Sequence, residues 1–161
     1  VLPLAVGGAL DPSSATLLNF TLGERYYQPY RPANVQLEGT AFGTYVSPDR
    51  DPKEVTWANR YRQGEDAVIL AWDDATVTPE PGQTTEIDVL RASDRTVLQS
   101  YTGLTGTSYT IPYTAWQGES EFIIQVWSER DGYRSLQAHE IVMEMPSPPG
   151  WGASYGSSWG A

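Results

Sequence analysis

The chain has 161 residues, which is enough for one domain with extensions, and its lack of cysteine excludes disulfide scaffolds and Cys-based zinc sites. Twenty acidic residues against ten basic ones give a net charge of -10, which opposes binding to nucleic acid and to anionic membrane surfaces. No stretch reaches the roughly 18 apolar residues of a membrane-spanning helix, so no membrane insertion is expected. The opening VLPLAVGGAL lacks the basic start of a signal peptide.

Residues 1–33 are predicted to be an irregular linking segment. Pro3, Gly7 and Pro12 break any long helix, and the alternation in LNFTLGERYY predicts a single strand. The following YQPYRP carries two prolines and therefore forms a stiff, extended connector.

Residues 34–145 are predicted to form an all-β sandwich. Seven short segments alternate between apolar and polar residues and are separated by Gly, Pro, Asn and Asp. In EFIIQVWSE, the alternation places Phe122, Ile124 and Val126 in the core and leaves Ile123 and Trp127 on the outer face. On that face they either meet a partner or are covered by the first 30 residues or by the long segment between Trp57 and Ile87. The seven segments cover residues 35–37, 54–61, 85–92, 95–101, 107–113, 121–129 and 139–145.

Two connections differ from short polar turns. The Asp-Gly pair of Arg130-Asp131-Gly132-Tyr133 favours a tight hairpin between the last two strands. A long insertion separates Trp57 from Ile87, in which AVILAW is compatible with an extra strand and DDATVTPEPGQ reads as an acidic loop. Loops of this length are usually functional or mobile.

Trp57, the stretch SYTIP and the run FIIQVWSERDGYRS together resemble a fibronectin type III domain. In that family the sixth strand carries a Tyr whose hydroxyl bonds back to the preceding corner. Phe122 occupies this position here and has no hydroxyl, so the corner must close in another way.

A second resemblance covers residues 17–145. The stretches LNFTLGERYYQPYRPANVQLEG, TWANRYR and PEPGQTTEIDVL resemble the C-terminal part of the baseplate-hub or host-specificity proteins of siphophages and gene-transfer agents. In that family a YRP connector leads into a fibronectin-like domain with a Trp-x-Arg-Arg-x-Arg strand. Here Asn59 replaces the first Arg, and Arg60 and Arg62 match the others. The resemblance implies a structural protein of the virion tail tip or baseplate, without enzymatic activity. Its partners would be other tail proteins in a homo-oligomeric or symmetric assembly, and a glycan or protein of the host surface.

A fibronectin-like fold implies that the loops after the second, fourth and sixth strands, at residues 62–84, 102–106 and 129–135, gather at one end and form the binding end. Aromatic side chains are favoured at interfaces and for stacking on sugars. The alternative function is therefore a carbohydrate-binding accessory module of a secreted, extracellular bacterial protein. Such a module would bind sugars through the side chains of Trp72, Trp127 or Tyr133. The partner-binding residues expected in the sandwich are Trp72, Asp73, Asp74, Trp127, Arg130, Asp131 and Tyr133.

Catalytic, cofactor and metal sites are not predicted. His139 is the single histidine and there is no G-x-S-x-G motif, so a nucleophile with its base is not expected. Asp73-Asp74 and the pair Asp49 and Asp51 lack the spacing of a calcium loop. A glycosidase needs two carboxylates across a cleft, which a small sandwich does not offer. A third and weaker hypothesis, after the tail-tip protein and the carbohydrate-binding module, is that the chain is a fragment of an enzyme.

Residues 146–161 are predicted to be a docking tail. Trp151, Tyr155 and Trp159 are each followed by glycine, and the segment carries no charge. Glycine costs about 1 kcal/mol in a helix, so the four-residue spacing does not indicate a helical stripe. A segment with so little to bury by itself needs another surface to hold its aromatic side chains.

Overall fold

The computed structural model describes residues 4–5, 8–9, 26–62, 70–116 and 118–146, and within them the protein is all-β apart from one short 3₁₀ helix. The predicted strand in LNFTLGERYY lies largely outside the described residues, as does most of AVILAW, whose described residues 70–72 form no strand. The elements are β1 (Leu4–Ala5), β2 (Gly8–Ala9), β3 (Ala33–Leu37), β4 (Thr44–Val46), β5 (Lys53–Ala58), β6 (Thr84–Arg91), β7 (Val97–Leu104), β8 (Ser108–Ile111), the 3₁₀ helix η2 (Tyr113–Trp116), β9 (Glu121–Arg130), β10 (Tyr133–Arg134) and β11 (His139–Glu144).

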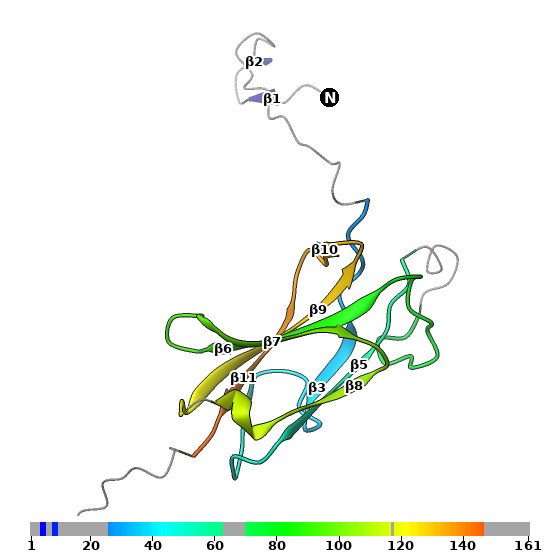
Figure 1. The fold of residues 1–161 in the computed structure, drawn as a ribbon. Coiled ribbons are helices and arrows are strands. Elements are labelled where there is room, and N and C mark those ends of the chain that lie inside the picture. Colours follow the sequence, from blue (N-terminus) through cyan, green and yellow to red (C-terminus); the bar gives the residue numbers. More distant parts are fainter. Residues whose placement is uncertain (1–3, 6–7, 10–25, 63–69, 117, 147–161) are drawn as a thin grey trace, which may run out of the picture.

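Two sheets pack face to face as a sandwich (Figure 1). One sheet has the order β3-β5-β8, and the other has the order β4-β11-β9-β6-β7, with β10 paired to β9. All these pairings are antiparallel except that of β4 with β11. The seven predicted strands are confirmed as β3, β5, β6, β7, β8, β9 and β11, and their order in the two sheets is that of a fibronectin type III-like sandwich.

The core lies between the inner faces of the two sheets. Along β9, the alternate residues that face the core are those that the sequence predicts. Phe122, Ile124 and Val126 have no exposed surface, because Val126 and Ile124 lie opposite Ile87 and Val89 of β6 in register. Each such side chain contributes about 1.5–3 kcal/mol of apolar burial. The other sheet supplies its buried residues Val35, Leu37, Val55, Trp57 and Ile111 to the same core.

Ile123 and Trp127 lie on the outer face of β9, as predicted, and neither is fully exposed there. Ile123 is buried, because β9 is a central strand and Ile123 lies between Leu90 of β6 and Val142 of β11. Trp127 is half-buried, with the Arg134 guanidinium 5.3 Å from the centre of its ring. Neighbouring strands and a cation therefore cover much of this face.

The corner before β9 closes without a tyrosine hydroxyl. Phe122 packs edge-on against Trp116 of η2, with ring centres 5.4 Å apart. The Arg50 guanidinium donates hydrogen bonds to the carbonyls of Trp116 and Glu119 at 3.1 and 2.7 Å, and to the carbonyl of Pro146 at 2.8 Å. One side chain thus ties the corner to the end of the last strand.

Candidate functional site

Three loops meet at one end of the sandwich, as the fibronectin-like fold predicts. The hairpin between β9 and β10 has two residues, Asp131 and Gly132, with φ of 54° and 85°, which is the backbone that an Asp-Gly turn favours. Arg130 at its base forms an ion pair with Glu80 of the β5–β6 loop. A cavity of about 70 Å³ separates the same loop, at Pro79 and Gln83, from the β7–β8 turn, at residues 104–106.

Glu80 is the central side chain of this end. Its carboxylate is fully buried and accepts a hydrogen bond from an Arg130 guanidinium nitrogen. A nitrogen of the Arg62 guanidinium lies 3.6 Å away, and the backbone N–H of Arg62 donates to Glu80 Oε1 at 3.0 Å. The sequence predicts an acidic loop here and gives no sign that one of its carboxylates is buried, as that of Glu80 is. We call Glu80, Arg62 and Arg130 the connector clamp.

The two arginines of the connector clamp also hold the incoming chain. Residues 26–32, here called the connector, run across this end before β3 begins. The Arg62 guanidinium donates to the backbone carbonyls of Tyr26 and Gln28, the latter at 3.2 Å, and Arg130 donates to the carbonyl of Tyr27 at 3.4 Å. The rings of Tyr27 and Tyr133 stack with their centres 5.4 Å apart. The connector is therefore fixed to the hairpin and to the β5–β6 loop together.

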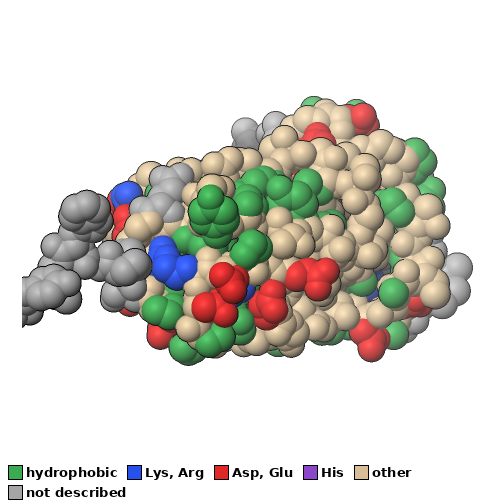
Figure 2. Space-filling view, turned by 60° about the horizontal axis from the view of Figure 1, so that its bottom comes forward, with side chains coloured by type: hydrophobic (Ala, Val, Ile, Leu, Met, Phe, Trp, Pro, Cys, Tyr) green, Lys and Arg blue, Asp and Glu red, His purple; other side chains and the backbone are tan. Residues whose placement is uncertain are grey.

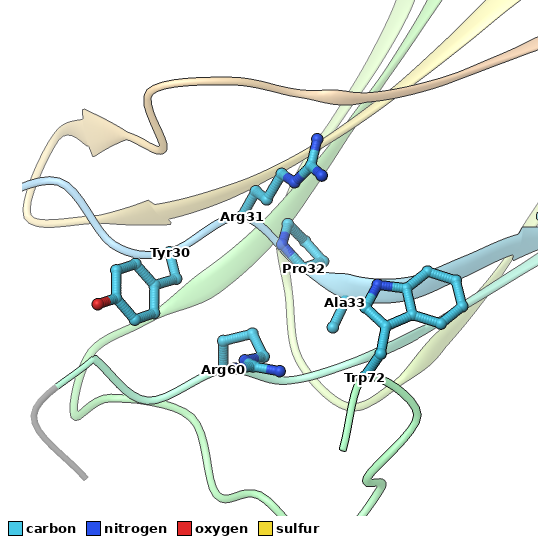
Figure 3. Close-up of a pocket in the computed structure, with 6 residues that line it drawn as sticks. All are labelled: Tyr30, Arg31, Pro32, Ala33, Arg60 and Trp72. Atoms are coloured by element: carbon cyan, nitrogen blue, oxygen red, sulfur yellow. The ribbon is translucent and has the colours of Figure 1, made fainter. Parts of the chain in front are cut away.

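A second feature of this end is an open pocket of about 280 Å³ beside the connector (Figure 3). Its lining residues are Tyr30, Arg31, Pro32, Ala33, Arg60 and Trp72. In Figure 3 the Arg60 side chain lies between Tyr30 and Trp72, while the Arg31 side chain points to the opposite side of the connector. The pocket thus combines two half-exposed aromatic rings with a guanidinium.

The wall of this pocket is held by aromatic stacking. The Trp72 ring stacks on Phe42 at 5.5 Å between centres, and Phe42 lies against His139. Nε2 of His139 bonds the carbonyl oxygen of Ala41 at 2.8 Å. Burial lowers the pKa of His139 below its ordinary value of 6.5, and the Arg31 charge lowers it further, against the opposing effect of the Ala41 bond. Burial thus favours the neutral form of His139, which packs against Phe42.

The predicted partner-binding residues fall into separate places. Trp72 lines the open pocket, and Asp73 is exposed beside it. Asp74 accepts hydrogen bonds from the backbone and hydroxyl of Thr76, and these bonds lower the pKa of its carboxyl group.

The three hairpin residues predicted to bind a partner make contacts within the chain. Arg130 belongs to the connector clamp, with Asp131 at 3.4 Å from its Nε, and Tyr133 stacks on the connector. The tail aromatics Trp151, Tyr155 and Trp159 lie outside the described residues.

Sequence reasoning did not identify Tyr27, Arg62 or Glu80 as members of this site. The available signal was charge balance, because the arginines that follow β5 and end β9 need carboxylate partners once they are covered, and the chain has an excess of acid. Among the described residues there is no cluster of three or more side chains suited to hold a metal ion. No helix in the described part of the chain is both long and apolar enough to cross a membrane.

Comparisons with known proteins identify no family for this chain. No protein-family model matches the chain, and no curated protein matches it. Among solved structures, a Fn3-like protein from Clostridium thermocellum is similar at 14% sequence identity and a TM-score of 0.38, over 76% of this chain and 98% of that chain. The assignment to a fibronectin type III-like fold rests on this chain's own strand order.

Proposed function

We propose that this chain is a structural module of a phage-like tail tip or baseplate, in which the sandwich is held at a fixed orientation to the segment that precedes it. The observation that carries the proposal is the connector clamp. Two of its three residues come from stretches that resemble tail-tip proteins, Arg62 from TWANRYR and Glu80 from PEPGQ. The connector that Arg62 holds, with the sequence YQPYRP, belongs to a third such stretch.

The clamp supports a mechanical role because it makes a joint stiff. Pro29 and Pro32 restrict the connector backbone and are both buried. A buried carboxylate shared between two guanidiniums tolerates few alternative arrangements, since each displaced charge would lose its partner. Neighbouring segments of a chain usually move relative to each other unless contacts between them are extensive, and here the buried prolines add to the contacts of the clamp. A fixed joint suits a protein whose copies must all present the same orientation in a symmetric assembly.

The proposed location is therefore the virion tail tip, with other tail or baseplate proteins as partners. Immunogold electron microscopy of particles from a producing strain tests this location directly, using an antibody against residues 34–145. Label at the tail tip is the expected result. Label confined to the soluble secreted fraction contradicts the proposal.

The role of the clamp has its own test. Replacing both Arg62 and Arg130 by Gln should lower incorporation of the chain into particles, because the connector loses its hydrogen bonds. Arg95→Gln is the matched control, since Arg95 forms an exposed ion pair with Glu140 away from the connector. If the double variant is incorporated as fully as the control, the fixed-orientation role is wrong even where the location is right.

One observation favours the second candidate, a carbohydrate-binding module. Trp72 and Tyr30 present exposed rings beside Arg60 in an open pocket, and aromatic faces stack on sugar rings while a guanidinium bonds a sugar carboxylate. The other two aromatic residues expected to bind sugars, Trp127 and Tyr133, have ring faces that are already in contact within the chain. The Arg134 guanidinium lies over Trp127, and Tyr27 stacks on Tyr133.

A glycan array with the purified chain tests this candidate. Saturable binding of an acidic glycan, lost in Trp72→Ala, would favour it over the structural role. Tyr113→Ala is the control, because Tyr113 is 67% exposed and belongs to η2, away from the loop end. Equal loss in both variants, or no binding, argues against a sugar site at Trp72.

A further inference from the structure

Residues 96–118 contain no Asp, Glu, Lys, Arg or His, although 19% of the whole chain is charged. This stretch forms β7, the turn after it, β8 and η2. Figure 2 shows a face on which acidic side chains gather in a row while a wide neighbouring area shows only uncharged side chains and backbone. The charges of this protein are therefore distributed unevenly over its surface.

The charge-free stretch also supplies a free edge of each sheet. Among the described strands, β7 pairs only with β6, and β8 pairs only with β5. The two edges lie on the same side of the sandwich, because the rings of Tyr101 on β7 and Tyr109 on β8 are 4.9 Å apart. We call β7 and β8 together the charge-free edge.

Along the charge-free edge runs a seam of apolar side chains that the core covers only in part. Leu98, Tyr101, Leu104 and Tyr109 pack against the core and remain partly exposed. Around them are Thr, Ser, Gln and Gly. Enrichment in tyrosine and depletion of charge are the features that distinguish the centre of a protein interface from ordinary surface.

Edge strands of natural sheets are usually protected against pairing by charged residues, prolines or bulges. Neither β7 nor β8 contains a charge or a proline. Two register shifts in the β6–β7 ladder are the protection that remains, and Gly103 with φ of 67° lies at one of them. These irregularities oppose the addition of a full-length strand and leave side-chain packing across the seam as the means of association.

A second copy of this chain fits this surface better than a charged partner does. Two copies with a net charge of -10 repel each other, and this repulsion is weakest when the surfaces that face each other carry no charge. A two-fold axis brings the same patch of both copies together, so a seam of Leu and Tyr meets an identical seam. We propose that the charge-free edge is the surface through which two copies of this chain pack together. This inference does not depend on a role in a tail tip.

Sedimentation equilibrium of the full-length chain, over about 10 µM to 1 mM, tests the proposal by measuring the dimer dissociation constant. Gln99→Glu places a carboxylate at an exposed position of β7 and should weaken dimerisation about tenfold or more, because like charges then face each other across the axis. Gln137→Glu is the matched control, since Gln137 is exposed, lies at the connector and changes the total charge equally.

Raised salt should strengthen the wild-type dimer, since it screens the repulsion between the acidic surfaces. Ser108→Glu on β8, opposite the uncharged Thr56 of β5, should reproduce the effect of Gln99→Glu, and circular dichroism should show both variants folded. The proposal is overturned if the chain stays monomeric throughout the concentration range. It is equally overturned if Gln137→Glu weakens association as much as Gln99→Glu, or if neither edge variant changes it.

Discussion

The connector clamp makes a quantitative prediction for Glu80→Gln, which keeps the shape of the side chain and removes its charge. In the wild-type protein the fully buried carboxylate faces two guanidiniums whose side chains are only 15% and 13% exposed. Removing one partner of a fully buried ion pair costs about 3–5 kcal/mol. Both arginines keep some contact with water, so we expect the free energy of unfolding to fall by about 2–4 kcal/mol.

Urea unfolding followed by tryptophan fluorescence measures this loss. The midpoint should fall while the slope with urea stays constant, because the substitution does not change the surface exposed on unfolding. Amide hydrogen exchange supplies a local readout. In the wild-type protein the backbone N–H of Arg62 donates a hydrogen bond to the Glu80 carboxylate. In the variant, the single carbonyl oxygen of Gln cannot accept hydrogen bonds from that N–H and from two guanidiniums at once. Exchange at Arg62 should therefore accelerate more than exchange at core amides of β9.

Glu119→Gln is the matched control, because Glu119 pairs with Arg91 at 2.8 Å while both side chains are about one third exposed. An exposed ion pair contributes about 0–1 kcal/mol to the free energy of unfolding. If Glu80→Gln costs no more than Glu119→Gln, the buried charges do not hold the connector, and the mechanical argument for the proposed function fails with them.

Three further predictions concern the corner and the single histidine. Arg50→Gln should lower the free energy of unfolding by about 1–3 kcal/mol in urea titrations, because Arg50 donates to three backbone carbonyls; an unchanged midpoint would show that the corner closes without it. Phe122→Tyr should destabilise the protein by about 1–3 kcal/mol, since the new hydroxyl enters a fully buried site packed on Trp116; a stabilised variant would mean that a tyrosine corner can still form. Because the pKa of His139 is lowered in the folded state, the unfolded chain binds more protons below about pH 6.5, so unfolding midpoints should fall as the pH drops from 7 toward 5. His139→Gln should reduce that dependence, and an identical pH profile in the variant would contradict this origin.

The candidate site was only partly predictable. The hairpin at Asp131-Gly132 follows from a dipeptide whose backbone preference is local, and its position beside the other loops follows from the fold class. Glu80 was not predictable as a buried group, because its sequence neighbours Pro79, Pro81 and Gly82 are equally typical of a solvated turn. Its burial depends on Arg130, which is 50 residues away along the chain.

The sequence by itself determined the sandwich, the seven strands and the core face of β9, because alternation with period two is set by residues adjacent in the chain. It did not determine which outer-face side chains are covered. Ile123 is buried because β9 became a central strand between β6 and β11, and Trp127 is covered because Arg134 lies across its ring. The tertiary structure also decided that the connector and the loops share one end, through contacts such as that of Arg130 with Tyr27, which are 103 residues apart. Such contacts depend on how strands are ordered across the sheets, and local periodicity carries no information about that order.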